Sequence, residues 1–393
     1  MDIKGIVAEI NSELIEVRRH LHRNPELSMN EFKTTEFVMD YLKDTSIDLK
    51  VMKGGVGVIG VLRGAKDGKT LALRGDLDAL PIHEKTGLEF SSDVDGVMHA
   101  CGHDLHTTVL LGTAIVLDRM KNDLSGQVKF IFQPGEEVME GAKFAIENGA
   151  LHDEPKVDNI VCLHTWPLVD AGKVGVRHGP IMAAADKFTI DVYGSGGHAA
   201  HPHISIDPIP VASQLVTNLQ SIVSRQLSPL NSAVVTLGQI NGGTGDNIIA
   251  DKVSLSGSLR TLDPDTREQI KQSIEQMSKH VAKANKTTAD VTFMPGSPPV
   301  INNDEIVDIF LKSSQELLGE DGVHYLTDPS LGGEDFSFYL EEVEGMLFRI
   351  GTRNDSEQST RSLHNPGIVF DEKAIPTGVM AMSAFAVEYL SGE

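Results

Sequence analysis

Hydrophobic positions ahead of residue 183 follow two alternating patterns. Apolar side chains recur at helical spacing over 6–21 and 31–42, which predicts two helices. The segments VGVIGVLRG (56–64) and TLALRGDLD (70–78) are predicted strands, and the second is nearly all apolar and therefore expected to be buried. Further predicted elements are helices at 107–120 and 141–148 and strands at 127–135 and 159–165. Because strands alternate with helices, we expect an α/β fold with a mixed, mostly parallel sheet.

The pattern changes near residue 183. The segment KFTIDVYG (187–194) alternates apolar and polar positions, which predicts a strand with one exposed face. Predicted elements continue as a helix at 209–226, strands at 232–240 and 252–262, a helix at 266–284 and a strand at 289–296. This β-α-β-β-α-β order is ferredoxin-like. The α/β pattern then resumes with helices at 304–318 and 374–390 and a strand at 346–351. We therefore expect an α+β domain, 183–296, inserted into a discontinuous domain formed by 1–182 and 297–393.

Length and charge narrow the class of protein. A chain of 393 residues fits two domains with ample core. The formal net charge of −22 argues against nucleic acid or a membrane surface as the main partner. No apolar run reaches the roughly 20 residues that span a bilayer, and the N-terminal helix has no secretory h-region. Two cysteines, Cys101 and Cys162, make no disulfide framework, so a cytoplasmic protein is expected.

Candidate metal ligands gather after predicted strands. Asp76 and Asp78 follow one strand, and the adjacent pair Glu136 and Glu137 follows another. His164 ends a third strand, and the stretch HACGHDLHT (99–107) precedes a helix. Ligands of open α/β sheets bind outside the carboxyl ends of the strands, so these residues are expected at one edge. A further candidate, His364, can join them only through the fold.

The chemistry of this set indicates a transition-metal site. Thiolate, imidazole and carboxylate together suit Zn²⁺, Mn²⁺, Co²⁺ or Ni²⁺ better than Ca²⁺ or Mg²⁺. Cys101 and His103, two residues apart on a predicted loop, can aim at one ion, and a thiolate can bridge two. Buried glutamates need a positive partner, which a metal supplies. In such a pair one carboxylate can bind the metal while the other acts as general base.

Other chemistries fit less of the sequence. A Cys101 nucleophile with His103 or His106 leaves the glutamate pair and His164 unexplained. The chain has no GxSxG motif, and its glycine runs lack both a Walker lysine and the dinucleotide fingerprint. In the inserted segment, Asn247 and Arg260 are residue types that suit a substrate carboxylate.

Nine segments follow one another along the whole chain: RRHLHRNPELSMNE (18–31), LRGDLDALPI (73–82), MHACGHDLHT (98–107), FQPGEE (132–137), LHTWP (163–167), GSGGHAAHPH (194–203), GGTGDNIIAD (242–251), LGGEDFSFY (331–339) and LHNPGIVFDE (363–372). Together they resemble the M20 metallopeptidase and aminoacylase family. The match is to its amidohydrolase subgroup, which includes N-acyl-amino-acid hydrolases, hippurate hydrolases, auxin-conjugate hydrolases and N-acetyldiaminopimelate deacetylases.

The resemblance implies a zinc-peptidase-like catalytic domain with two divalent metal ions and an inserted lid domain that commonly mediates dimerisation. The implied metal ligands are Cys101, as the bridge, with His103, Glu137, His164 and His364. It implies Glu136 as general base and His198 as the lid histidine that polarises the substrate carbonyl, often from a partner subunit. Asn247 and Arg260 correspond to binders of the substrate carboxylate, and Asp78 to a residue that orients a ligand. Where the peptidase branch has His-x-Asp, this chain has Asp76-x-Asp78, as in the amidohydrolase branch, and no role follows for Asp76.

These assignments predict a metal-dependent hydrolase of linear amide C–N bonds. The expected reaction is deacylation of N-acyl amino acids by a metal-activated water, with Glu136 as base, in a homodimer or higher homo-oligomer. The expected ions are Mn²⁺, Zn²⁺, Co²⁺ or Ni²⁺. One alternative is a dipeptidase or carboxypeptidase of the same family, and a more distant one is a non-catalytic protein that binds a metal or metabolite.

Overall fold

The computed structural model describes residues 2–392, which form two compact units. The larger unit comprises Met1–Gly179, Ile301–Asp328 and Asp335–Glu393, and the smaller comprises Pro180–Val300 and Pro329–Glu334. The chain passes between the units at β7 (Gly179–Met182), at β14 (Val300–Asn302) and around residues 328–335. Among the described helices, none is both long enough and apolar enough to cross a membrane.

The larger unit is built on a sheet of eight strands in the order β1-β2-β4-β3-β5-β16-β6-β15. Its centre is parallel, because β3 pairs with both β4 and β5, and β5 pairs with β16, in parallel register. The strands toward one edge, β1 and β2, are antiparallel. The bounds are β1 Asp48–Val51, β2 Val58–Arg63, β3 Lys66–Asp76, β4 Ser125–Gln133, β5 Asn159–Asp170, β6 Val174–Val176, β15 Val323–Tyr325 and β16 Glu344–Arg353.

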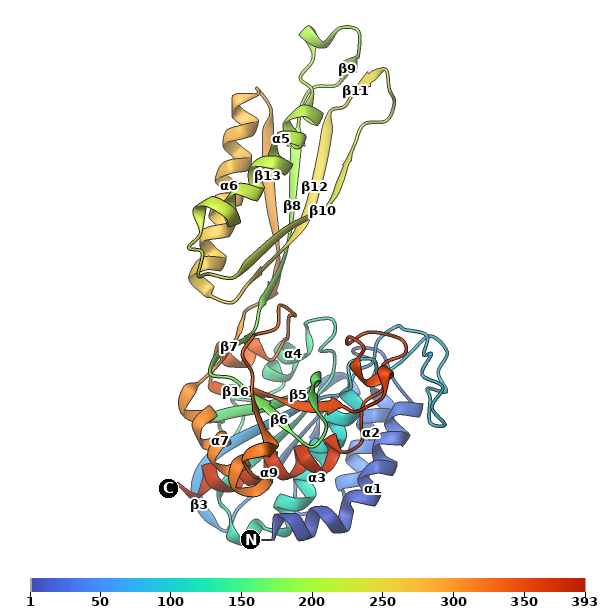
Figure 1. The fold of residues 1–393 in the computed structure, drawn as a ribbon, viewed down its shortest axis with the longest axis vertical. Helices are drawn as coiled ribbons and strands as arrows, with labels where there is room; N and C mark the ends of the chain where they lie inside the picture. The colour runs from blue at the N-terminus through green and yellow to red at the C-terminus, as the bar shows by residue number, and fades with distance from the viewer. Residues whose placement is uncertain (1, 393) are drawn as a thin grey trace. The chain divides into compact units, whose positions relative to one another are not determined.

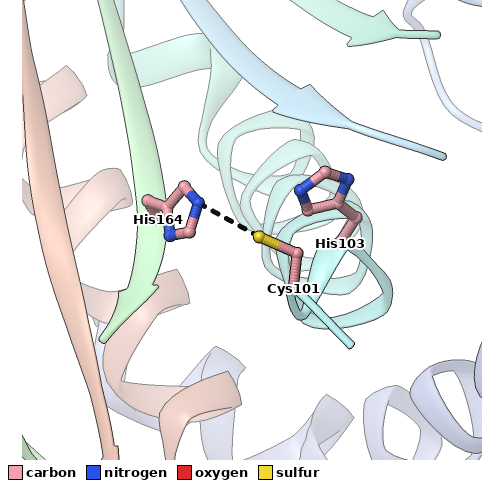
Figure 2. A group of neighbouring side chains, drawn as sticks. All are labelled: Cys101, His103 and His164. Atoms are coloured by element: carbon pink, nitrogen blue, oxygen red, sulfur yellow. Dashed lines mark hydrogen bonds between the residues drawn. The ribbon is translucent and has the colours of Figure 1, made fainter. Parts of the chain in front are cut away.

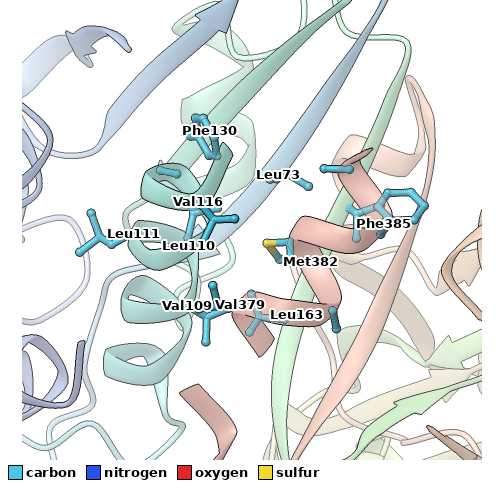
Figure 3. Packing of buried hydrophobic residues seen from close by; sticks show 14 of the residues in the cluster. Leu73, Val109, Leu110, Leu111, Val116, Phe130, Leu163, Val379, Met382 and Phe385 are labelled. Carbon is cyan, nitrogen blue, oxygen red and sulfur yellow. The ribbon is translucent and has the colours of Figure 1, made fainter. Parts of the chain in front are cut away.

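Helices pack on this sheet and on one another. Three of them, α1 (Ile3–Arg23), α3 (His103–Arg119) and α9 (Ala374–Ser391), contact each other, and α3 and α9 also contact the central strands. Figure 3 shows apolar side chains of α3 and α9 packed in this core. The remaining helices of the unit are α2 Phe32–Leu42, α4 Gly141–Glu147, α7 Asp304–Leu318 and α8 Ser337–Leu340. The central strands are therefore buried, as their apolar sequences require.

The smaller unit has a core of its own. Its main sheet has four strands, all antiparallel, in the order β10-β12-β8-β13. Phe188, Ile190 and Val192 of β8 are buried beneath two helices, α5 and α6, which cover one face of the sheet in Figure 1. The bounds are β8 Ala184–Tyr193, α5 Pro208–Ser221, β10 Ala233–Gly242, β12 Lys252–Thr261, α6 Pro264–Ala284 and β13 Thr288–Ser297. The predicted fold class, a mostly parallel sheet flanked by helices with a ferredoxin-like insertion, is confirmed.

Several predicted elements have different bounds in the structure, and three of these differences have a clear physical reason. The helix expected from residue 107 begins at His103, directly after Gly102 in left-handed conformation. Nearly every side chain of α3 is buried, so its first turn shows no helical alternation of apolar and polar residues. The strand expected to end near His164 continues to Asp170, because β16 pairs with it over that length. The helix predicted at 209–226 is α-helical only to Ser221 and ends in a π-helical turn, η4 (Ile222–Gln226).

Candidate metal centre

Three strands present polar residues at the carboxyl edge of the large sheet. β3 ends at Asp76 and β4 ends at Gln133, three residues before Glu136. Pairing of β5 with β3 stops at Cys162, while pairing of β5 with β16 continues past His164. His164 therefore lies inside a strand, where the sheet opens on one side, rather than at a strand end as predicted. Open α/β sheets generally bind their ligands at this edge.

A left-handed glycine joins the first two candidate ligands. Gly102 has a φ of +89°, and His103 is the first residue of α3. A Cβ on Gly102 would lie 2.7 Å from Cγ2 of Thr165, so only glycine fits between Cys101 and His103. The two residues are thus aimed by a glycine turn into a helix, and not by the extended loop that the sequence suggested. Figure 2 shows His164 projecting from β5 toward Cys101, with Nε2 3.5 Å from Sγ.

The glutamate pair lies in the loop after β4 and is largely buried. Glu136 is 4% exposed, and the Glu137 side chain is 10% exposed. The Glu137 backbone N–H donates to Oδ2 of Asp78 at 3.0 Å, which fixes the loop against the segment that follows β3. Nε2 of His103 lies 3.8 Å from Glu137 Oε1 and 4.0 Å from Glu136 Oε2.

His364 reaches this cluster from a distant part of the chain. Its backbone N–H donates to the carbonyl oxygen of Ala100 at 3.0 Å, beside Cys101. Its Nε2 lies 3.4 Å from Glu137 Oε1. The residue has a φ of +65°, unusual for a side chain other than glycine, and is half exposed. The fold therefore brings together the candidate that sequence spacing alone could not place.

The candidate ligand atoms form overlapping groups in which all members lie within 4.8 Å of one another. One group contains Cys101, His103 and His164, and another contains Cys101, Glu137 and His364. A third contains His103, Glu136 and Glu137, so Cys101 and His103 each belong to more than one group. The structure thus assembles all five residues that the sequence resemblance implied as ligands.

The donor atoms fit a divalent metal. Nδ1 of His103 lies 3.2 Å from Oδ1 of Asp78, a hydrogen bond that leaves Nε2 to face Cys101 and the glutamates. This Nε2 is buried and has no hydrogen-bond partner. A buried polar atom without a partner is costly, and a bound cation would satisfy it. The combination of thiolate, imidazole and carboxylate is the donor set of a transition-metal ion.

Charges in the cluster shift its pKa values in opposite directions. Burial lowers the pKa of His164, and the nearby Arg349 and His106 lower it further. Burial also acts to lower the pKa of His103, but Asp76 and Cys101 outweigh it and hold that pKa well above its usual range. Hydrogen bonds to Cys101 and Glu137 raise the pKa of His364 to about 10. Burial raises the pKa of the Cys101 thiol, and the nearby charge of Glu137 raises it further. Such strong mutual perturbation is common at functional sites.

In the smaller unit, His198 and Asn247 line one cavity of 630 Å³. His198 lies on the short strand β9 (Gly197–His198). Asn247 directly precedes β11 (Ile248–Ile249), which pairs with β9. Nδ1 of His198 accepts a hydrogen bond from the Ala200 backbone N–H at 3.1 Å. Arg260 lies on β12 and is not among the residues that line this cavity. The structure therefore groups two of the three predicted substrate contacts of this unit.

Sequence reasoning left two buried polar networks without a role. Arg74 donates to Asp76 at 2.6 Å and to Asp335 at 2.8 Å. Asp104, in the first turn of α3, accepts from Arg18 at 2.9 Å and lies 2.8 Å from Nδ1 of His22. The signal that could have found them is a charged residue in an otherwise apolar segment, as Arg74 is in TLALRGD.

Fold and site together define the class: an α/β enzyme with a candidate metal centre of thiol, imidazole and carboxylate groups at the carboxyl edge of its sheet. The model of peptidase family M20/M25/M40 matches residues 72–388, and the chain belongs to this family.

Relatives of known name agree with this membership. The chain is 40% identical to the N-acetyl-L-cysteine deacetylase of Bacillus subtilis over 94% of its own length and 86% of that protein. It is 38% identical to thermostable carboxypeptidase 2 of Saccharolobus solfataricus over 98% of both chains. A crystal structure of a B. subtilis dinuclear metal-binding peptidase from the M20 family aligns with a TM-score of 0.85 and 34% identity, covering 98% of this chain and 99% of that one. The protein is a hydrolase that acts on amide bonds.

Proposed function

We propose that this protein is a metal-dependent amidohydrolase that removes the acyl group from N-acyl amino acids. The observation that carries the proposal is the pair of ligand groups that share Cys101, with Glu136 beside them. Two groups with one common thiolate suit two divalent ions of the Mn²⁺, Zn²⁺, Co²⁺ or Ni²⁺ class. The relative named as an N-acetyl-L-cysteine deacetylase supports an N-acyl amino acid as the substrate class.

Cys101, His103, Glu137, His164 and His364 would hold the two ions, with Cys101 as the bridge. Asp78 would orient His103, because the hydrogen bond to Nδ1 directs the Nε2 lone pair into the cluster. Asp78 also accepts from Ser28 at 2.7 Å and from the Glu137 backbone at 3.0 Å, so it couples two of the ligands.

Glu136 is assigned as the general base. When bound, the ions would supply Lewis acidity toward the acyl oxygen and lower the pKa of water in the site. Glu136 takes a proton from the attacking water and returns it to the nitrogen of the leaving amine. Its near-complete burial keeps bulk water from competing for that proton.

The substrate's polar groups are assigned to the smaller unit. Because Nδ1 of His198 accepts from a backbone N–H, its neutral ring carries the proton on Nε2 and can donate it to the acyl oxygen. Asn247 and Arg260 would bind the substrate carboxylate.

We place the protein in the cytoplasm as a homodimer, with light scattering as the test of the dimer. Both cysteines are free thiols, as a cytoplasmic metal-binding cysteine must be.

Replacement of Glu136 tests the mechanism. Glu136→Gln keeps the shape of the side chain but cannot take a proton, so turnover of N-acyl amino acids should fall by about 10²-fold or more. Metal content, measured by elemental analysis, should stay at the wild-type value. Glu140→Gln, an exposed change in the same loop, is the matched control and should be fully active. Loss of metal in parallel with activity would show that Glu136 is a ligand and not the base.

A peptidase activity is the second candidate, because one relative is named as a carboxypeptidase. The two functions differ in the group on the acyl side of the scissile bond, an acyl chain in one case and a peptide with a free amine in the other. A panel of N-acetyl amino acids, N-benzoyl amino acids and dipeptides, assayed on metal-reconstituted protein, separates them. Faster hydrolysis of dipeptides than of every N-acyl amino acid would replace our proposal with the peptidase.

A further inference from the structure

Asp76 and His106 are buried beside the candidate ligands, yet the proposed mechanism gives neither a role. Oδ1 of Asp76 lies 2.6 Å from Nδ1 of His106. On the other side of the ring, the backbone N–H of Thr165 donates to Nε2 of His106 at 2.8 Å. The His106 ring also packs against two candidate ligands, with its centroid 5.2 Å from that of His103 and 4.9 Å from that of His164.

These contacts determine the tautomer of His106. A backbone N–H only donates, so Nε2 must accept and carries no proton. The neutral ring then carries its proton on Nδ1 and donates it to Asp76. Both ring nitrogens are engaged, and His106 has no lone pair left for a metal. Asp76, His103 and His106 lie close enough together to hold an ion, but this tautomer excludes His106 as a ligand.

Both partners of His106 are anchored firmly. Arg74 donates to Oδ2 of Asp76 at 2.6 Å, and Thr107 donates to the Asp76 carbonyl oxygen at 2.8 Å, so Asp76 ties β3 to α3. Thr165 follows His164 directly, and its hydroxyl donates to the carbonyl oxygen of Cys101 at 2.6 Å. His106 thus connects β3 and α3 to the two backbone positions that carry Cys101 and His164.

We propose that His106, held by Asp76, is a positioning residue that sets Cys101 and His164 at the spacing a metal ion requires. This inference rests on the proposed metal centre and adds two residues to it. His106 acts through the Thr165 backbone and by packing against the two histidine rings. Residues that orient metal ligands from behind typically change metal affinity about 10–100-fold when replaced.

Titration of the metal-free, full-length protein with Co²⁺ tests the proposal. In His106→Gln, the amide oxygen can still accept from Thr165, whereas in His106→Asn the amide nitrogen can still donate to Asp76. Both variants should bind as many Co²⁺ ions at saturation as the wild type, with about 10–100-fold weaker affinity. The weakening should be greater in the Asn variant, and the visible absorption of the bound Co²⁺ should change. Thr113→Val, which removes a buried hydroxyl from the same helix, is the control and should bind Co²⁺ like the wild type.

Each contrary result has one meaning. Loss of one Co²⁺ equivalent in either variant would show that His106 is a ligand, and wild-type affinity in both would show that it positions nothing. Equal weakening in Thr113→Val would reduce the effect to general destabilisation and overturn the proposal. A wild type that binds no Co²⁺ would overturn the metal centre itself. A wild type that binds Co²⁺ but cleaves no N-acyl amino acid would overturn only the proposed substrate.

The tautomer provides a second measurement, made on the wild type and independent of metal affinity. Nitrogen NMR of the metal-free wild type, labelled only at histidine, should show a ring protonated at Nδ1 and unprotonated at Nε2. That signal should be missing from His106→Gln, which assigns it. A His106 ring protonated at Nε2 would contradict the inferred hydrogen bonds and with them the positioning role.

Discussion

At the scale of single residues, the candidate site depends on a glycine as well as on its candidate ligands. Gly102 lies between Cys101 and His103, with a φ of +89° and no room for a Cβ against Thr165. The left-handed turn starts α3 at His103 and brings the side chains of both candidate ligands into one group. A residue with a side chain would face two separate costs there, the strained backbone and the steric clash.

A comparison of Gly102→Ala with the same substitution at a second glycine should separate the backbone cost from the steric cost. Gly87 has a φ of +74° but open space where a Cβ would lie, so Gly87→Ala meets only the backbone cost, about 1–2 kcal/mol. Gly102→Ala should lower the free energy of unfolding by about 1–3 kcal/mol more, because of the clash with Thr165. Urea unfolding of the metal-free proteins, followed by the fluorescence of the single tryptophan, Trp166, measures the difference. Equal losses would show that Thr165 moves aside without cost.

At the scale of elements, one buried ion pair joins a strand and a helix of the smaller unit. Asp186 of β8 is fully buried and accepts two hydrogen bonds from Arg267 of α6, both at 2.7 Å, and one from Lys271 at 3.0 Å. Burial acts to raise the pKa of Asp186, but these two cations outweigh it and lower that pKa below its ordinary value. The carboxylate therefore favours the folded unit wherever it is ionised.

The lowered pKa predicts how this unit responds to acid. Stability from Asp186 is fully present above its unfolded pKa of about 4 and is lost as the pH falls through the lower folded pKa. Hydrogen exchange of peptides from β8 and α6, corrected for the intrinsic rate, should therefore show lower opening free energies below about pH 4.

Asp186→Asn provides the comparison for this prediction. It should exchange faster than the wild type at pH 7, because Arg267 and Lys271, both partly buried, lose the carboxylate that they contact, and should change less with acid. Asp290→Asn, an exposed change on neighbouring β13, is the control and should match the wild type. An acid response in Asp186→Asn as steep as that of the wild type would assign the effect to other carboxyl groups.

The elements also show where sequence patterns have information and where they do not. The alternation of apolar and polar positions located β8 and α6, since one face of each is buried. It missed the start of α3, which is buried on all sides, and strands such as β6 and β15, which have three residues each and are too short to show a period.

The residues of the candidate site also differ in whether the sequence could place them. Residues that follow strands, such as Asp78 and Glu137, could be expected at one edge from the sheet rule alone. The approach of His364 to Ala100 and the contact of His106 with Thr165 depend on the packing of segments distant in sequence. Local periodicity contains no information about such pairs, so the resemblance to a family indicated His364 and nothing indicated the role of His106.

At the scale of the whole molecule, the two units have separate cores. All of the candidate metal ligands lie in the larger unit. A ligand that binds only the folded state stabilises the unit that binds it. Metal should therefore affect the two units unequally.

Removal of metal should lower the melting temperature of the larger unit alone. Metal at 100 times its dissociation constant contributes about 2.7 kcal/mol, which corresponds to about 5–11 °C for a unit of this size. Scanning calorimetry with and without a chelator measures the shift, and Trp166 fluorescence identifies the transition of the larger unit. A shift of the same size in the transition of the smaller unit would show that the two units melt together.

The position of the insertion has a consequence for biosynthesis. Cys101, His103 and His164 are all translated before the smaller unit, whereas His364 follows 200 residues after His164. At about 5–20 residues per second, a ribosome needs about 10–40 s to cover that distance. During this interval the nascent chain contains one complete group of the proposed ligands and lacks His364, a member of the other. In the proposed two-ion centre, the residues for one ion are therefore made well before the last residue for the other.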